Sequence, residues 1–218
     1  MTLFTTFVRT RLSTLITTLA LAAALLGAAF LAAWLTRDTP LFSLLPPGGN
    51  VADIQPDQRQ DLHRTFFTIW ASLLLAMPAL GLVWFNSSSK LAARGWLVFW
   101  SAAWLVFVVH FYWAVSVIFG NDWERIRHTA RVSAPILDTV FAVWWTLDVC
   151  LAWLLSASPW WVRVQRAGVH LLAFVLFFMG AAREGELLTS RGLGWALAAV
   201  TACAMVAWGV RRWRAVRA

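Results

Sequence analysis

Charged residues are scarce in this chain. Asp, Glu, Lys and Arg make up 13% of its 218 residues, whereas hydrophobic residues make up 61%. A soluble domain usually carries about 25% charged residues. The composition therefore excludes an ordinary soluble domain and is typical of an integral membrane protein.

Cysteine and histidine are also rare, with two and four residues respectively. The chain contains no C-x-x-C, so neither a redox pair nor a zinc knot is indicated. We expect Cys150 and Cys203, which both lie in apolar stretches, to be small buried hydrophobic side chains. Four histidines are too few for the eight-histidine boxes of membrane di-iron enzymes, which excludes the desaturase and hydroxylase type.

Known catalytic motifs are absent as well. The sequence has no H-E-x-x-H, no G-x-S-x-G, no Walker loop and no G-x-G-x-x-G. An intramembrane enzyme acting on a lipid or isoprenoid would need more convergent polar groups than the sequence offers. It is the least favoured class of function.

The chain does contain six long apolar stretches, at about residues 12–35, 65–85, 96–120, 132–155, 168–180 and 192–210. A helix needs about 20 apolar residues to cross a hydrocarbon core of about 30 Å. No stretch alternates with the period of two that a membrane barrel strand shows. We predict an all-α fold, in which a polytopic bundle of about six transmembrane helices forms a single integral membrane domain.

The net charge of +8 is unevenly distributed along the chain. Basic residues cluster where alternate stretches end, at Arg9, Arg11, Lys90, Arg94, Arg163, Arg166, Arg211, Arg212, Arg214 and Arg217. The positive-inside rule then predicts that both termini are cytoplasmic and that residues 37–64 form a periplasmic loop. Anionic lipid head groups explain the basic side, so membrane lipids rather than nucleic acid are the expected partners. The Arg-rich, Ala-rich and Trp-rich composition indicates the inner membrane of a bacterium.

Tryptophan is unusually abundant, with 16 residues. Many lie where stretches end, as in the aromatic belts of membrane proteins. Trp96, Trp100 and Trp104 instead form an i, i+4, i+8 ladder on one helix face. Because an indole N–H in hydrocarbon needs a hydrogen-bond partner, we expect some of the indoles within the stretches to point inward.

Three ionisable residues lie in the central part of the predicted bundle: His110, Asp148 and His170. Each such group costs membrane insertion energy, about 2.5–3.5 kcal/mol for Asp on insertion scales, and is a candidate functional residue. His110 and His170 each precede a helix-ending glycine, Gly120 or Gly180, by the same spacing, which places both about 15 Å below the outer surface. Paired at that depth they would ligate one b-type haem, with Asp148 as a hydrogen-bond partner of a ligand histidine.

Two other interpretations of these residues stay open. Histidines in membrane helices often form hydrogen bonds between helices, which would make the three residues structural. Alternatively, Asp148 forms a proton or ion path with a histidine.

A second candidate site lies on the outer side. Asp53, Asp57 and Asp61 recur at i, i+4 and i+8, with His63 nearby and His128 in another loop. His63, His128 and Asp61 would provide suitable ligands for Cu or Zn. The competing interpretation is a solvated acidic face near a helix N-terminus, where negative charge is favourable.

Together these features favour a non-catalytic membrane subunit, accessory to or part of a larger membrane complex that carries electrons, with one b-type haem in one version. Other membrane protein subunits are its expected partners. The alternatives are a small transporter or proton channel that uses Asp148, and an outer-side metal-binding protein.

Overall fold

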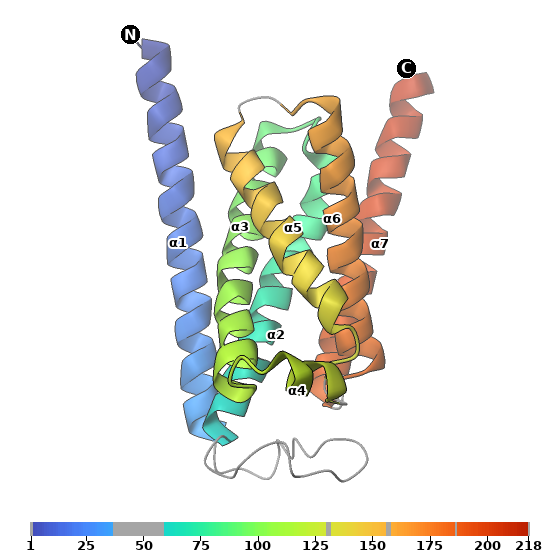
Figure 1. The fold of residues 1–218 in the computed structure, drawn as a ribbon. Coiled ribbons are helices and arrows are strands. Elements are labelled where there is room, and N and C mark those ends of the chain that lie inside the picture. The colour runs from blue at the N-terminus through green and yellow to red at the C-terminus, as the bar shows by residue number, and fades with distance from the viewer. Residues whose placement is uncertain (1, 37–58, 130–131, 156–157, 186, 218) are drawn as a thin grey trace.

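The computed structural model describes residues 2–36, 59–129, 132–155, 158–185 and 187–217, and the regular structure within them is entirely helical (Figure 1). The α-helices are α1 (Thr2–Thr36), α2 (Arg59–Leu82), α3 (Lys90–Tyr112), α4 (Trp123–His128), α5 (Pro135–Leu154), α6 (Trp160–Phe178) and α7 (Leu188–Arg217). A 3-10 turn, η4 (Val83–Phe85), extends α2. Two π-helical turns, η5 (Trp113–Ile118) and η6 (Met179–Arg183), extend α3 and α6.

Six of these helices are long and apolar enough to cross a membrane, and only the short α4 is not. The predicted all-helical fold with six apolar spans is therefore confirmed for the described residues. The fifth span differs from the prediction, because α6 begins at Trp160 rather than near residue 168. A helix over residues 168–180 would rise only about 20 Å, which is too short for a hydrocarbon core of about 30 Å.

Local sequence signals set where several helices begin. The side chain of Ser89 accepts a hydrogen bond from the backbone N–H of Ala92 at 3.2 Å and caps α3. Asp122 caps α4 in the same way, accepting from the N–H of Arg125 at 3.0 Å. Pro135 occupies the first turn of α5, where its missing N–H costs nothing. Such caps satisfy donors that a helix N-terminus leaves unpaired.

Helix α2 packs against α1, α3 and α7. Helices α5 and α6 pack on each other; α5 also packs against α3, and α6 also packs against α7. Figure 1 shows α1 and α7 on opposite flanks of the bundle, with both termini at the same end. Large aromatic side chains fill the core between α3 and α5. The Trp145 ring lies 4.6 Å from Trp100, 5.2 Å from Phe107 and 5.0 Å from Phe141, measured between ring centroids.

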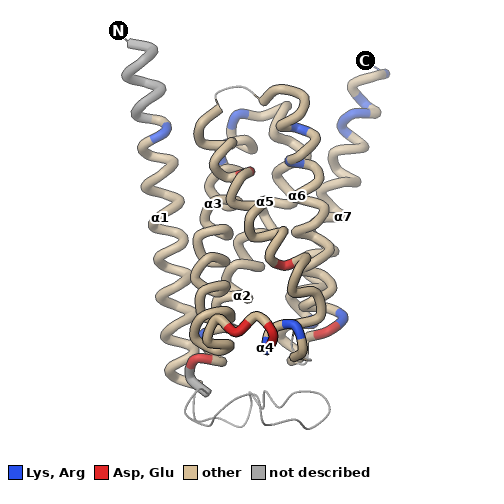
Figure 2. Tube along the Cα trace, viewed as in Figure 1, with Lys and Arg blue, Asp and Glu red and all other residues tan. Residues whose placement is uncertain are grey.

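Charge differs between the two ends of the bundle (Figure 2). We call the end that carries both termini the terminal end, and the opposite end the α4 end. Most described Asp and Glu residues gather at the α4 end, whereas Asp148 lies inside the bundle. This asymmetry is the one on which the predicted orientation of the chain depends.

The expectation that the two cysteines are buried is wrong. Cys150 and Cys203 are both exposed on the outside of the bundle. A thiol behaves as a small hydrophobic group, so an outward position on an apolar helix carries no desolvation cost in lipid.

Candidate functional site

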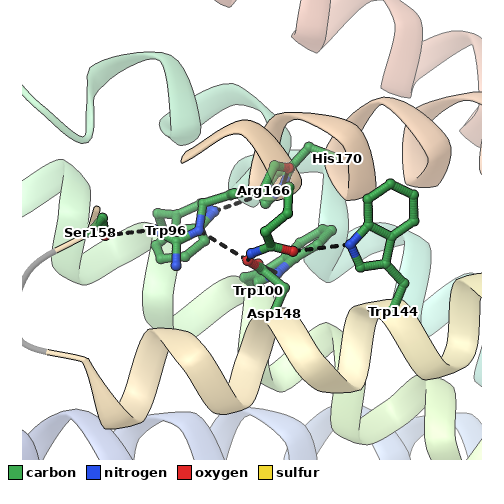
Figure 3. A network of polar contacts seen from close by, with 8 residues as sticks. Trp96, Trp100, Trp144, Asp148, Ser158, Arg166 and His170 are labelled. Atoms are coloured by element: carbon green, nitrogen blue, oxygen red, sulfur yellow. Dashed lines mark hydrogen bonds and ion pairs between the residues drawn. The ribbon is translucent and has the colours of Figure 1, made fainter. Parts of the chain in front are cut away.

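Asp148 is the centre of a polar network inside the bundle (Figure 3). Its side chain, on α5, is fully buried. The carboxylate accepts hydrogen bonds from Trp100 Nε1 at 2.9 Å, Gln165 Nε2 at 2.6 Å and Arg166 Nε at 3.2 Å. A buried carboxylate is tolerated only when it is paired and hydrogen-bonded, and here a guanidinium and two neutral donors meet that need.

The tryptophan ladder of α3 points into this network. Trp96 Nε1 donates to His170 Nε2 at 2.8 Å, and Trp104 Nε1 donates to Thr146 Oγ1 at 3.0 Å. Trp100, between them, donates to the carboxylate described above. The prediction that some of the indoles within the spans point inward is therefore confirmed, because these three N–H groups reach side chains of α5 or α6.

His170 is held on every side by protein groups. Its Nε2 accepts from Trp96, and its Nδ1 donates to the backbone oxygen of Arg166 at 2.8 Å. Its ring stacks on Trp100 with centroids 3.9 Å apart and planes 19° from parallel. This pattern corresponds to the neutral tautomer with its proton on Nδ1. His170 therefore links α6 to α3.

Arg166 provides the positive charge of the network. Its guanidinium lies 4.4 Å from the ring centroid of Trp96, a cation–π contact, and its side chain is only 13% exposed. Its Nη1 lies 3.4 Å from Ser158 Oγ. The neighbouring Gln165 accepts from Trp144 Nε1 at 3.0 Å while it donates to Asp148, so the network joins α3, α5 and α6.

His110 lies elsewhere in the bundle. Its Nδ1 donates to the backbone oxygen of Thr65, on α2, at 2.9 Å. Along α3 it is about 15 Å beyond Trp100, the residue on which His170 stacks. The structure thus brings Asp148 and His170 together around Trp100, but it does not bring His110 to them.

His110 and His170 precede Gly120 and Gly180 by the same number of residues, but this equal spacing does not place the two histidines at the same depth in the bundle. The chain turns at Gly120, which has φ +63°, whereas Gly180 lies within η6 and the helix continues past it. Haem ligation by the two histidines stays an untested prediction, and the contacts of His170 do not favour it. In this geometry, ligation through Nε2 would require His170 to give up its bond from Trp96.

The outer-side metal ligands are not gathered either. Each has another partner: His63 Nδ1 lies 3.3 Å from Thr36 Oγ1, Asp61 pairs with Arg64 at 2.7 Å, and His128 lies 3.1 Å from Glu124. Among the described residues no three His, Cys, Asp or Glu side chains are grouped so as to hold a metal ion. Asp53 and Asp57 lie outside the described residues.

Sequence reasoning missed Gln165 and Arg166. It assigned both to the connection before the fifth span and explained Arg166 by the positive-inside rule alone. A signal was present, because the predicted fifth span was too short to cross a bilayer. Extending it toward the N-terminus places both residues on the same helix as His170.

Comparison with protein-family models, curated proteins and solved structures found no match for the chain.

Proposed function

We propose that this chain is a non-catalytic integral membrane protein that acts as an accessory subunit of a larger membrane complex. The closed polar network carries the proposal. Asp148, both ring nitrogens of His170 and the amide of Gln165 have protein partners. A catalytic centre needs polar groups directed at a substrate, whereas these groups hold α3, α5 and α6 together.

The charge asymmetry supports a bacterial inner membrane as the location, with both termini in the cytoplasm. The basic residues near the first turns of α3 and α6 and in the last turns of α7 gather at the terminal end, and most described acidic residues lie at the α4 end (Figure 2). Under the positive-inside rule the terminal end faces the cytoplasm. Anionic lipids of that leaflet would lie beside these arginines.

The outward face of α1 supports another membrane helix as the partner. Ala20, Ala24 and Ala28 recur at i, i+4 and i+8 and are exposed, and Gly27 lies beside them. A Cβ added at Gly27 would meet nothing within 4 Å. Small residues at this spacing let the backbones of two membrane helices approach closely.

The experiment compares particle mass in native lipid. The chain is expressed at its natural level, extracted with its surrounding lipids and weighed by native mass spectrometry. We expect a complex heavier than one chain, and Ala24→Leu with Gly27→Leu should release the monomer. Val206→Leu, at an exposed position of α7, is the matched control and should leave the complex intact. A wild-type protein that is monomeric in native lipid would contradict the proposal.

A proton or ion path through Asp148 is the second candidate. Arg166, the charge partner of Asp148, also lines a cavity at the terminal end. Arg166 therefore connects this cavity with the buried carboxylate. Proton uptake into proteoliposomes tests it: uptake lost in Asp148→Asn protein that circular dichroism shows to be folded, but retained in Glu124→Gln, would favour the path. Uptake that Asp148→Asn leaves unchanged would rule it out.

A further inference from the structure

Arg94, near the start of α3, carries a charge that no described carboxylate balances. Its side chain is exposed, and its Nη2 donates to the neutral Ser13 Oγ of α1 at 3.2 Å. It lines a cavity of about 420 Å³ at the terminal end, between α1, α3, α5 and α6. Arg166 lines this cavity too, but Asp148 balances its charge. Arg94 is therefore left to pair with an anionic group from outside the described part of the chain.

The contact with Ser13 also shows which side of α1 lies toward Arg94. Three small residues follow Ser13 at i+7, i+11 and i+14 and are exposed: Ala20, Ala24 and Gly27. That spacing places them on the same helix face as Ser13. It is the face on which the accessory function proposed above places a partner helix. A partner helix that packs along this face toward the terminal end therefore passes close to Arg94.

A second copy of this chain does not supply the missing carboxylate. Copies of one chain insert in the same orientation, so their terminal ends lie on the same side of the membrane. Asp148 is buried and already pairs with Arg166. The other described acidic residues lie at helix ends on the α4 side, in a first turn or at a cap: Asp61, Asp122, Glu124, Asp138 and Glu184. The described part of the chain thus offers no acidic residue to Arg94 of a neighbouring copy.

We propose that the partner is a different membrane protein, with a spanning helix that packs on Ala20, Ala24 and Gly27 and presents an Asp or Glu to Arg94. Small residues let the two helix backbones approach closely. The guanidinium and the carboxylate form charge-assisted hydrogen bonds, which fix the depth and orientation of the partner helix. This inference rests on the proposed accessory function and names the chemistry of the partner.

The first test uses two synthetic probes in place of the partner. Each is a single membrane-spanning peptide helix rich in leucine and alanine, with a small residue at every fourth position of one face. The two peptides differ only near one end, where one carries Glu and the other Gln. Fluorescently labelled peptide is titrated with the full chain, purified in neutral detergent. Arg94→Gln is the main variant, and Arg163→Gln is the matched control, since Arg163 is exposed on α6 and does not line the cavity.

We expect the wild type to bind the Glu peptide more tightly than the Gln peptide by about threefold to tenfold, the effect of one ion pair at a partly hydrated position. Arg94→Gln should abolish this preference, and Arg163→Gln should retain it. Ala24→Leu should weaken both peptides alike, because it blocks close approach without changing charge. Near-ultraviolet circular dichroism checks folding. If Arg94→Gln does not fold, the wild-type preference must still shrink as salt is added.

The second test weighs the native particle described above. We expect a mass that is not a whole multiple of the mass of this chain, and Arg94→Glu should release the monomer while Arg163→Glu leaves the particle intact. Equal binding of the two peptides, a preference that survives Arg94→Gln, or a particle built of identical copies would overturn the inference. So would an intact Arg94→Glu particle that has lost a phospholipid, which would assign Arg94 to a lipid head group. A wild-type monomer contradicts the accessory function itself, whereas a complex that survives Arg94→Glu contradicts this inference alone.

Discussion

Replacing Asp148 by Asn should destabilise the protein severely. The side chain keeps its size but loses the charge that balances Arg166, which is only 13% exposed. An Asn side chain also carries an NH2 group in place of one carboxylate oxygen. That NH2 group would face N–H donors from which the carboxylate oxygen now accepts hydrogen bonds. Removing one partner of a buried ion pair costs about 3–5 kcal/mol, and we expect Asp148→Asn to fall in that range.

The assay is reversible unfolding in mixed micelles of a mild detergent and dodecyl sulfate, followed by circular dichroism. Glu124→Gln is the matched control, because Glu124 forms ion pairs at the surface with 69% of its side chain exposed. An exposed pair contributes at most about 1 kcal/mol. Combining Asp148→Asn with Arg166→Gln should cost less than the two changes added together, since neither charge is then left unpaired. A cost below about 1 kcal/mol for Asp148→Asn, or simple additivity, would refute the reasoning.

Two further substitutions, each with a control, test the network and the packing of α7 on η6. Trp96→Phe removes the donor to His170 Nε2 and should cost about 1–3 kcal/mol in the same assay. Trp195→Phe, at a 61% exposed position, should cost less and is its control. Gly194→Ala should destabilise by about 1–3 kcal/mol, because its Cβ would lie 2.5 Å from the backbone nitrogen of Ala182. Gly209→Ala meets nothing within 4 Å and should instead stabilise by about 0.5–1 kcal/mol; equal effects of the two would contradict the packing of α7 on η6.

The fold was predictable because hydropathy and length determine which segments form membrane helices. Six apolar stretches became six long helices, and the boundary error at the start of α6 contradicted the length that a bilayer requires. The exposed cysteines show the limit of this reasoning. Apolar character marks a span but does not tell the core face from the lipid face.

The candidate site was predictable only in part. The spacing of the α3 tryptophans placed them on one face, and burial within a span identified Asp148 and His170. Their partners depend on the stagger between helices, which no local pattern encodes. His110 and His170 occupy similar sequence positions, yet one reaches the backbone of Thr65 and the other reaches Trp96. Arg166 was hidden because the positive-inside rule explained its charge without reference to a partner.

The most direct test of a structural rather than cofactor-binding core is the visible absorption spectrum of the purified protein, oxidised and then reduced with dithionite. Both nitrogens of His170 are engaged by Trp96 and Arg166, so we expect no Soret band and no α band from well-folded protein. A Soret band with a sharp α band on reduction, lost in His170→Ala, would contradict a core whose polar groups serve only to hold the helices together.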